Sequence, residues 1–305
     1  MRTFRIRSFF DKLQHEWLVK FVEHRIGDKR VVRLIQKWLK AGVMEDGQWS
    51  ETKEGSPQGS VIPGLRVRSG SPILANLYLH YVLDLWVEVW RKKLARGEVM
   101  IVRYADDAVL GFEHREDAER FLEQLRERLR KFGLELHPEK TRLIEFGRYA
   151  IERREKRGEG KPETFNFLGF THICGTSHKT GYFTVHRRTI GKRMAAKLKD
   201  IRVKLRTRMH ARVRGTVQGL VQVVRGYFQY HAIPGNGARM RAFRKDVLRI
   251  WYQALRRRSQ RSRLTRERFL KRLAVLLPPV QVLQPYPSAR FDAKHPNIRG
   301  KNRVR

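Results

Sequence analysis

Apolar residues recur every three or four positions along much of the chain, which is the pattern of amphipathic helices. In the N-terminal half this pattern covers residues 15–26, 31–39, 71–90 and 118–132. Ser71 and Pro72 give the third stretch an N-cap and a proline at the first helical position. Gly133 offers a C-cap to the fourth. The third stretch is apolar over most of its surface, which indicates a buried helix.

Short β-forming runs separate these helices. The sequence predicts strands at TFRIRSFF, on both sides of the turn that carries Asp106 and Asp107, and around Pro138. FNFLGFTHI and YFTVHR form a predicted hairpin, joined by CGTSHKTG. The charged, glycine-containing residues 148–162 are predicted to form an exposed loop.

From about Thr189 the pattern changes to helices that are rich in Arg and Lys. These helices are predicted at residues 190–210, 214–232, 238–259 and 266–277. The predicted fold class is therefore α+β. A mixed domain of residues 1–186 is followed by an all-α domain of residues 187–305, which ends in an irregular basic tail.

Positive charge is concentrated in the C-terminal part. The chain of 305 residues has a net charge of +37, and residues 187–305 hold 33 Lys and Arg against four Asp and Glu. A folded polycation of this density repels itself unless a polyanion neutralises it, and nucleic acid is the commonest such partner. No basic amphipathic segment stands alone as a membrane anchor. We therefore expect RNA or DNA as the partner, and no membrane.

The remaining composition is that of a globular chain. It is 41% hydrophobic, with six Trp and sixteen Phe, which is far from a disordered profile. The one cysteine, Cys174, excludes an internal disulfide. MRTFRIRSFF lacks the apolar region of a signal peptide, and no apolar run is long enough to span a membrane. We expect a cytoplasmic protein, and its oligomeric state stays open.

Two adjacent carboxylates, Asp106 and Asp107, lie at a predicted strand junction in RYADDAVLGF. Mg²⁺ takes oxygen ligands, and a two-metal site holds the attacking and leaving oxygens during phosphoryl transfer. Taken alone, the pair is weak evidence of such a site, because Asp also favours solvated turns.

Six motifs extend this interpretation, and they are IRSFFD (6–11), GSPQG (55–59), SPILANLYLHYVLDLW (71–86), RYADD (103–107), LHPEKT (136–141) and FNFLGF (165–170). In these motifs and their order the chain resembles the reverse transcriptases encoded by group II introns, the intron maturases. RGYFQYHAIPGN and WYQALRRRSQR look like the family's thumb and maturase region. The resemblance implies a partial right-hand polymerase palm in residues 1–186 and an RNA-binding thumb and maturase domain in residues 187–305.

The resemblance also implies roles for individual residues. Asp106 and Asp107 would be the catalytic, metal-binding pair, with Mg²⁺ as cofactor, for transfer of deoxynucleotides to a primer 3′-hydroxyl. The nucleotide and primer would be bound by Gln58, Gly59, Lys140, Phe167, Leu168 and Gly169. Intron RNA or an RNA/DNA primer-template would be the partner. The densest cluster of basic residues, expected to contact its phosphates, is Arg256, Arg257, Arg258, Arg261 and Arg263.

The sequence departs from the family pattern in three places. Aligned on IRSFFD, Arg5 stands where the family has its first catalytic Asp, so a metal ligand is replaced by a guanidinium. The family's fingers would precede this motif, which predicts a truncated copy in which residues 1–5 do not complete a strand. Residues 63–70 look like an eight-residue insertion beside the nucleotide pocket.

Three hypotheses remain open. The first is an RNA-directed DNA polymerase of the group II intron type. The second is a remnant that binds intron RNA and assists splicing without catalysing polymerisation. The third is a chain that does not fold stably, because an incomplete palm sheet exposes its edge.

Overall fold

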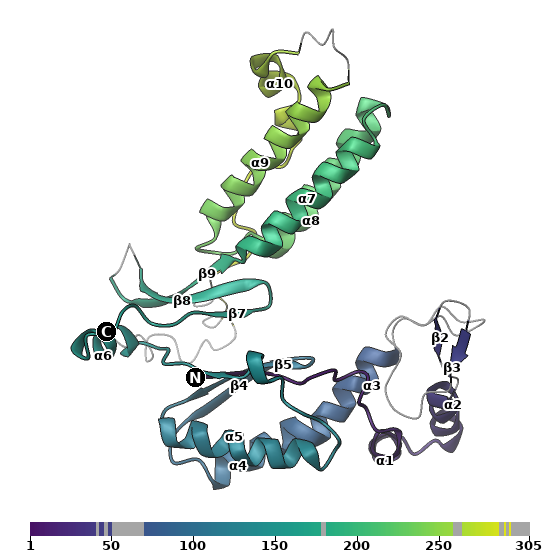
Figure 1. Cartoon of the computed structure of the whole chain (residues 1–305), viewed down its shortest axis with the longest axis vertical. Helices are drawn as coiled ribbons and strands as arrows, with labels where there is room; N and C mark the ends of the chain where they lie inside the picture. The colour runs from purple at the N-terminus through teal and green to yellow at the C-terminus, as the bar shows by residue number, and fades with distance from the viewer. Residues whose placement is uncertain are drawn as a thin grey trace. The chain divides into compact units, whose positions relative to one another are not determined.

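A computed structural model describes residues 1–40, 43–45, 48–50, 70–177, 181–258, 264–286, 290 and 293. It divides into two compact units, residues 1–145 and residues 146–305. Both contain strands and helices (Figure 1), which confirms the α+β class. None of the helices in the described ranges is long and apolar enough to cross a membrane.

Four antiparallel strands form the sheet of the first unit, in the order β4-β5-β1-β6. They are β4 (Val99–Tyr104), β5 (Asp107–Phe112), β1 (Arg2–Arg5) and β6 (Arg142–Leu143). β1 pairs with β5 on one side and with β6 on the other, so it lies inside the sheet. The prediction that residues 1–5 do not complete a strand is wrong, because later parts of the chain supply both neighbours.

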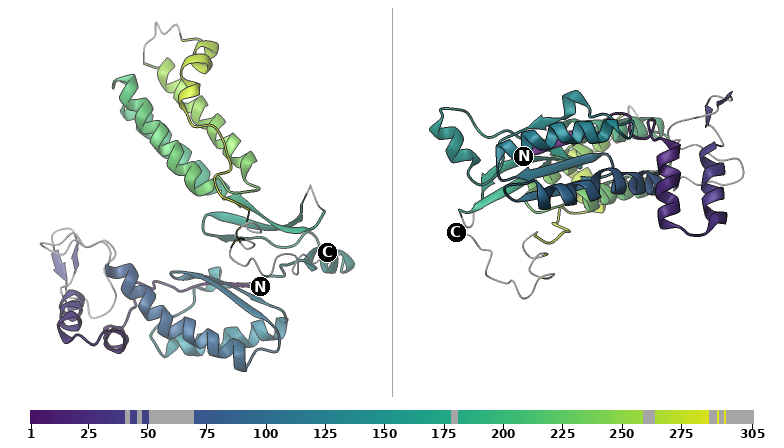
Figure 2. Two further views of the ribbon diagram at one scale, coloured as in Figure 1. Left: turned by 180° about the vertical axis from the view of Figure 1, so that it is seen from behind. Right: turned by 90° about the horizontal axis from the view of Figure 1, so that it is seen from below.

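Helices α4 and α5 run along one face of this sheet (Figure 2). The described helices of the first unit are α1 (His15–Arg25), α2 (Lys29–Lys40), α3 (Gly70–Leu79), the π-helical η1 (His80–Asp84), α4 (Leu85–Lys93), α5 (Arg115–Arg130) and the 3₁₀-helical η2 (Pro138–Lys140). A small hairpin of β2 (Val43–Glu45) and β3 (Gln48–Ser50) follows α2. The predicted N-cap Ser71 lies inside α3, which begins one residue earlier.

Side chains of β1 alternate between the two faces of the sheet. Phe4 is buried in the core, and Arg2 is buried with its Nε donating to the Ala118 carbonyl of α5 at 3.1 Å. Because successive side chains of a strand point to opposite faces, Thr3 and Arg5 belong to the face away from α5. That open face is where the charged residues of the candidate site lie.

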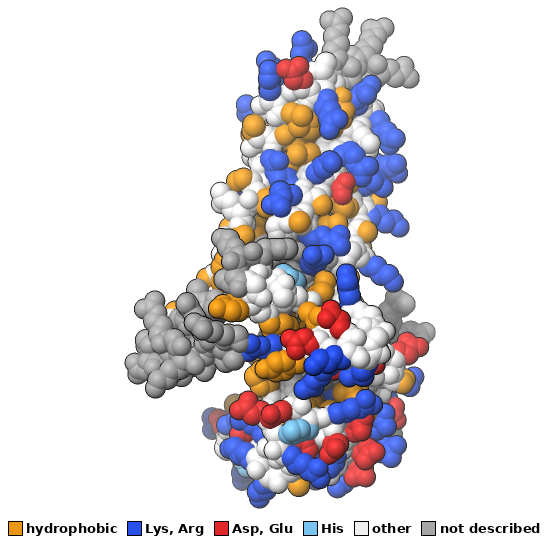
Figure 3. Space-filling model, turned by 90° about the vertical axis from the view of Figure 1, so that its left-hand side faces the viewer, with side chains coloured by type: hydrophobic (Ala, Val, Ile, Leu, Met, Phe, Trp, Pro, Cys, Tyr) orange, Lys and Arg blue, Asp and Glu red, His pale blue; other side chains and the backbone are white. Residues whose placement is uncertain are grey.

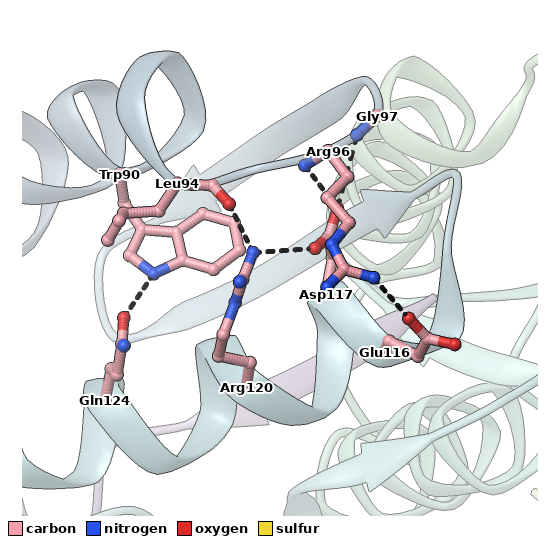
Figure 4. Close-up of polar contacts among 8 residues, drawn as sticks. All are labelled: Trp90, Leu94, Arg96, Gly97, Glu116, Asp117, Arg120 and Gln124. Carbon is pink, nitrogen blue, oxygen red and sulfur yellow. Dashed lines mark hydrogen bonds and ion pairs between the residues drawn. The ribbon is translucent and has the colours of Figure 1, made fainter.

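A buried carboxylate holds the loop between α4 and β4 (Figure 4). Asp117 Oδ2 accepts hydrogen bonds from the backbone N–H groups of Arg96 at 2.8 Å and Gly97 at 3.3 Å, and Oδ1 pairs with Arg120 Nη2 at 2.9 Å. Arg120 also donates to the carbonyl of Leu94. Burial alone would raise the pKa of Asp117, but these partners together hold it below its ordinary value. The network therefore fixes where β4 starts.

The second unit joins a three-stranded sheet to long helices. Its strands are β7 (Phe165–Phe167), β8 (Phe170–Thr176) and β9 (Phe183–Thr189), and its helices are α6 (Ala150–Lys156), α7 (Gly191–Thr207), α8 (Val213–His231), α9 (Gly237–Arg256), α10 (Arg266–Arg272) and the 3₁₀-helical η3 (Ala274–Leu276). Four of these confirm the helices predicted after Thr189. The exposed loop predicted at residues 148–162 is wrong in part, because α6 lies within it.

A buried polar cluster ties β9 to the helices. Asn236, only 1% exposed, donates from Nδ2 to Thr189 Oγ1 at 2.7 Å and to the His231 carbonyl at 2.8 Å, and its Oδ1 accepts from the Thr189 backbone N–H. Burial lowers the pKa of His231 to about 4, so the ring beside the cluster is neutral at pH 7. Strands β7–β9 thus belong to the compact unit of the helices, whereas the sequence divided the chain at residue 187. The roles assigned to residues 1–186 and 187–305 stay predictions.

Candidate active site

A two-residue turn carries the paired carboxylates. Ala105 and Asp106 join β4 to β5, and Tyr104 and Asp107 form the last strand pair before the turn. Ala105 has φ +52°, a left-handed conformation that residues other than glycine adopt rarely. In the neighbouring pairing of β5 with β1, Asp107 lies opposite Arg5. The fold therefore brings Arg5 to the carboxylates, as the sequence alignment predicted.

Arg5 forms an ion pair with both aspartates. Its Nε lies 2.8 Å from Asp106 Oδ2 and 3.3 Å from Asp107 Oδ1. The Asp106 side chain is only 17% exposed, whereas those of Arg5 and Asp107 are 41% exposed. The hydrogen bond to Asp106 raises the pKa of the Arg5 guanidinium, which stays positively charged in the physiological range. A permanent cation thus lies against the carboxylate pair.

This donor set does not fit the two-metal site that the resemblance implies. Mg²⁺ requires several oxygen ligands in near-octahedral geometry, and two carboxylates already paired with a guanidinium do not supply them. Within the described ranges, no group of three or more His, Cys, Asp or Glu is placed to hold a metal ion. The site therefore consists of two carboxylates that share one guanidinium, which offsets half of their negative charge.

A second arginine holds the turn from the other side of the hairpin. Arg103, with a side chain only 14% exposed, makes a bidentate ion pair with Asp84, from Nε to Oδ1 at 2.7 Å and from Nη2 to Oδ2 at 2.6 Å. Its Nη1 donates to the Ala105 carbonyl at 3.1 Å and to Asn76 Oδ1 at 3.0 Å. Asp84 ends η1, and π-helical turns occur frequently at functional sites. We call Arg103, Asp84 and Asn76 the turn clamp.

The sequence analysis missed the turn clamp, although the chain carries a signal for it. Asp84 is the only charged residue between positions 71 and 87. A carboxylate inside an apolar helix requires a partner, because an unpaired charge away from water is costly. Its partner, Arg103, is a neighbour in RYADD of the residues that the sequence singled out.

Lys140 belongs to a segment that lies beside β1, the strand that carries Arg5. It is exposed at the end of η2, and the preceding backbone pairs with β1, since His137 N–H donates to the Arg5 carbonyl at 2.8 Å. Of the two strands predicted around Pro138, β6 and an isolated bridge between Ile6 and Leu136 are present. The structure thus places η2, which carries Lys140, beside the end of β1 at which Arg5 lies.

The remaining predicted nucleotide and primer residues do not belong to the described part of the first unit. Gln58 and Gly59 lie outside the described residues, as do residues 63–69 of the insertion. Phe167, Leu168 and Gly169 belong to the second unit, where the turn between β7 and β8 contains Leu168 with φ +46° and Gly169 with φ +81°. Their role in binding a primer stays a prediction.

A tyrosine of α8 anchors this second turn. Tyr230 Oη donates to the Leu168 carbonyl at 2.8 Å, and its ring stacks on Phe170 with centroids 5.8 Å apart. A Cβ at Gly169 would lie 3.2 Å from Arg193 Nη1 and 3.4 Å from Tyr230 Cε1. The sequence analysis did not identify this anchoring contact.

Replacing Gly169 with alanine is therefore expected to destabilise the second unit by about 1 kcal/mol or more, because the left-handed backbone and the tight contacts both oppose a side chain. Gly226→Ala in α8 is the matched control, since its Cβ meets nothing within 4 Å and alanine favours helix. Urea denaturation should show lower stability for Gly169→Ala and unchanged or higher stability for Gly226→Ala. Equal losses would contradict this interpretation of the turn.

The predicted RNA-contacting arginines are described only in part. Arg256 and Arg257 are exposed at the C-terminal end of α9, and the Arg256 guanidinium lies 6.0 Å from the Tyr252 ring centroid. Arg258 is half-buried. Arg261 and Arg263 lie outside the described residues.

Residues 2–172 match the sequence profile of the family described as "Reverse transcriptase (RNA-dependent DNA polymerase)". The chain is similar to the group II intron-encoded protein LtrA of Lactococcus lactis subsp. cremoris, with 37% identity over 91 residues, which are 30% of this chain and 14% of that protein. It is similar to an uncharacterized 91 kDa protein in the cob intron of Schizosaccharomyces pombe, with 37% identity over 27% of this chain and 9% of that protein. Protein YkfC of Escherichia coli K12 is 31% identical over 50% of this chain and 47% of its own length.

The chain spans less than half the length of each of these relatives. Among solved structures, an apo telomerase from Candida tropicalis aligns with a TM-score of 0.46 and 12% identity, over 90% of this chain and 44% of the telomerase. A telomerase from Candida albicans in complex with a fragment of telomeric RNA aligns with a TM-score of 0.41 and 11% identity, over 85% and 44%.

Proposed function

The chain belongs to the reverse transcriptase family, and from that premise we propose that it acts as a reverse transcriptase and maturase of the group II intron type. Its 37% sequence identity to intron-encoded proteins over the aligned residues supports this assignment. The observation that carries the proposal is the turn that presents Asp106 and Asp107 at one end of an antiparallel sheet. In this proposal the partner is intron RNA or an RNA/DNA primer-template, and deoxynucleotides are the substrate.

The architecture supports a palm in the first unit. Its antiparallel sheet has helices on one face and leaves the other face, with Arg5 and Asp107, open. A nucleic acid strand can approach a charged site on such a face without displacing the core. The helices from α7 to α9 would then act as the thumb and maturase domain, and their positive charge would neutralise RNA phosphates.

The ion pairs of Arg5 favour a second candidate function, which is RNA binding without polymerisation. The reverse transcriptase family generally uses a divalent metal, and Mg²⁺ is the ion that we propose for an active site of this kind. In this chain the Arg5 guanidinium contacts one carboxylate oxygen of each aspartate, Asp106 Oδ2 and Asp107 Oδ1, and so competes with the ion for them. Holding intron RNA requires no such ion.

Primer extension on an RNA template tests these functions, with RNA binding measured in the same preparation at 50 and 200 mM salt. Contacts to six or more phosphates predict a loss of RNA affinity of about a thousandfold over this salt range. Asp106→Asn is the informative variant, and Asp11→Asn on an exposed turn is the control. Extension that Asp106→Asn abolishes would establish the polymerase, and salt-sensitive binding without extension would establish the second candidate. The absence of both would overturn the proposal.

A further inference from the structure

A groove of about 1300 Å³ lies along α9 and α10. Its walls are basic, and the exposed basic residues that line it are Arg241, Lys245, Arg249, Arg256, Arg257 and Arg266. Asp246 is the one acidic residue among its described lining residues. The groove therefore favours an anionic ligand.

Most of these cations are available to a ligand. Arg249 Nη2 pairs with Asp246 at 3.1 Å. Arg244, which also lines the groove, donates to the carbonyls of Ala274 and Pro278 and so holds the wall in place. Arg241, Lys245, Arg256, Arg257 and Arg266 form no ion pair with another described residue. Arg256 does lie over the Tyr252 ring, but no carboxylate of a described residue neutralises these five charges.

The floor of the groove is apolar and aromatic. Leu248, Tyr252 and Phe269 line it, with the Tyr252 and Phe269 ring centroids 5.3 Å apart. Leu270 beside them is 44% exposed. Tyr252 Oη donates to the Leu264 carbonyl at 3.4 Å, which limits how the ring can turn. Figure 3 shows hydrophobic side chains interspersed with Lys and Arg over the helices of this unit.

The combination of basic walls and an apolar floor favours single-stranded over double-stranded nucleic acid. A duplex presents phosphates outward and keeps its bases inside, so basic walls suffice for it and an apolar floor adds nothing. A single strand presents phosphates and bases together, and its bases stack on aromatic side chains. Basic walls around an aromatic floor match the single strand.

We propose that this groove binds an unpaired RNA segment, with phosphates on the basic walls and bases on Tyr252 and the apolar floor. The inference rests on the proposed function only in that the chain acts on RNA. It names a ligand class, single-stranded RNA, and a site that includes Lys245 and Tyr252, which the sequence-based arginine cluster does not contain.

The test compares the affinity of the full chain for a short oligouridylate and for a blunt RNA duplex across a salt series. Tyr252→Leu removes the aromatic ring from the floor, and Leu270→Asn is a second floor variant whose exposed side chain can be changed without opening the core. Lys245→Gln changes the wall. Lys199→Gln on α7, also exposed and outside the groove, is the matched control.

We expect Tyr252→Leu to weaken oligouridylate binding about fivefold or more, because stacking on an aromatic ring is lost, and to leave duplex binding unchanged. Lys245→Gln should reduce the salt slope for the single strand by about 0.7, and Lys199→Gln should not change it. The proposal would be overturned if Tyr252→Leu and Leu270→Asn weakened binding of the oligouridylate and of the duplex equally. Equal salt slopes for the two lysine variants would also overturn it.

Groove variants that leave RNA binding intact but abolish binding of an acidic amphipathic peptide would assign the groove to a protein partner. Failure of the unmodified chain to bind either RNA would instead refute the proposed function.

Discussion

Arg5→Asp is expected to make the first unit respond to Mg²⁺, which the unmodified chain should not do. The substitution places a third carboxylate opposite Asp107 in the register of β1 and β5 and removes the cation from Asp106. Without metal the three carboxylates repel one another, so the variant should unfold at a lower temperature than the unmodified chain. Mg²⁺ at about a hundred times its dissociation constant should then restore about 2.7 kcal/mol, because it binds only the folded state.

Thermal unfolding with and without Mg²⁺ measures this response, and Arg5→Gln is its control because it removes the positive charge without adding a ligand. We expect the largest Mg²⁺-dependent rise in Tm for Arg5→Asp and a small rise for Arg5→Gln. A gain of primer extension by Arg5→Asp would show that Arg5 limits polymerisation by the unmodified chain. Stabilisation of the unmodified chain to the same extent as Arg5→Asp would show that the guanidinium does not obstruct metal binding.

Asp84→Asn is expected to lower the free energy of unfolding by about 2–3 kcal/mol. The change breaks the bidentate pair and leaves the guanidinium of Arg103 in a largely enclosed site without its counter-charge, and removal of one partner of a buried pair is strongly destabilising. This loss is smaller than the about 3–5 kcal/mol typical of a fully buried pair, because the Asp84 side chain is partly exposed. Urea denaturation of the unmodified chain and the variant measures the difference.

Glu88→Gln is the control for the turn clamp. Glu88 lies on the neighbouring helix α4, where its exposed carboxylate pairs with Arg91 and Lys92, and exposed pairs of this kind contribute little. We expect no measurable change in stability for this variant. Asp84→Asn should also speed hydrogen exchange at the turn, since Arg103 would hold the Ala105 carbonyl less firmly. Equal stability of the two variants would show that the clamp contributes no more than a surface pair.

Local patterns predicted the helices of this chain better than they predicted its strands. The ends of α7, α8 and α9 lie within a few residues of the predicted positions. The apolar periodicity of a helix depends only on residues close together in the sequence, so it can be recognised locally. β1 was predicted to be incomplete by comparison with the family pattern, whereas its pairing partners, β5 and β6, are distant in sequence and complete it. Helix α6 was missed because its short, charged segment has no apolar face of regular spacing.

The candidate site shows the same difference between features set by local sequence and features set by distant contacts. Asp106, Asp107 and the substitution at Arg5 could be identified from motifs, because each lies at a fixed offset within one. The ion pairs of Arg5 depend on strand register, and the pairing of Asp84 with Arg103 depends on where η1 and β4 meet. Local spacing encodes neither of these. The roles of Gln58 and Gly59 stay predictions.

The central place of β1 has a consequence for the order in which the first unit can fold during synthesis. Arg2 pairs with Leu110 on one side and with Leu143 on the other, so this strand leaves the ribosome long before either partner exists. Until then its apolar side chains, such as Phe4, have no sheet to join. Such distant contacts slow folding, and the four-stranded sheet can close only after residue 143 has been translated.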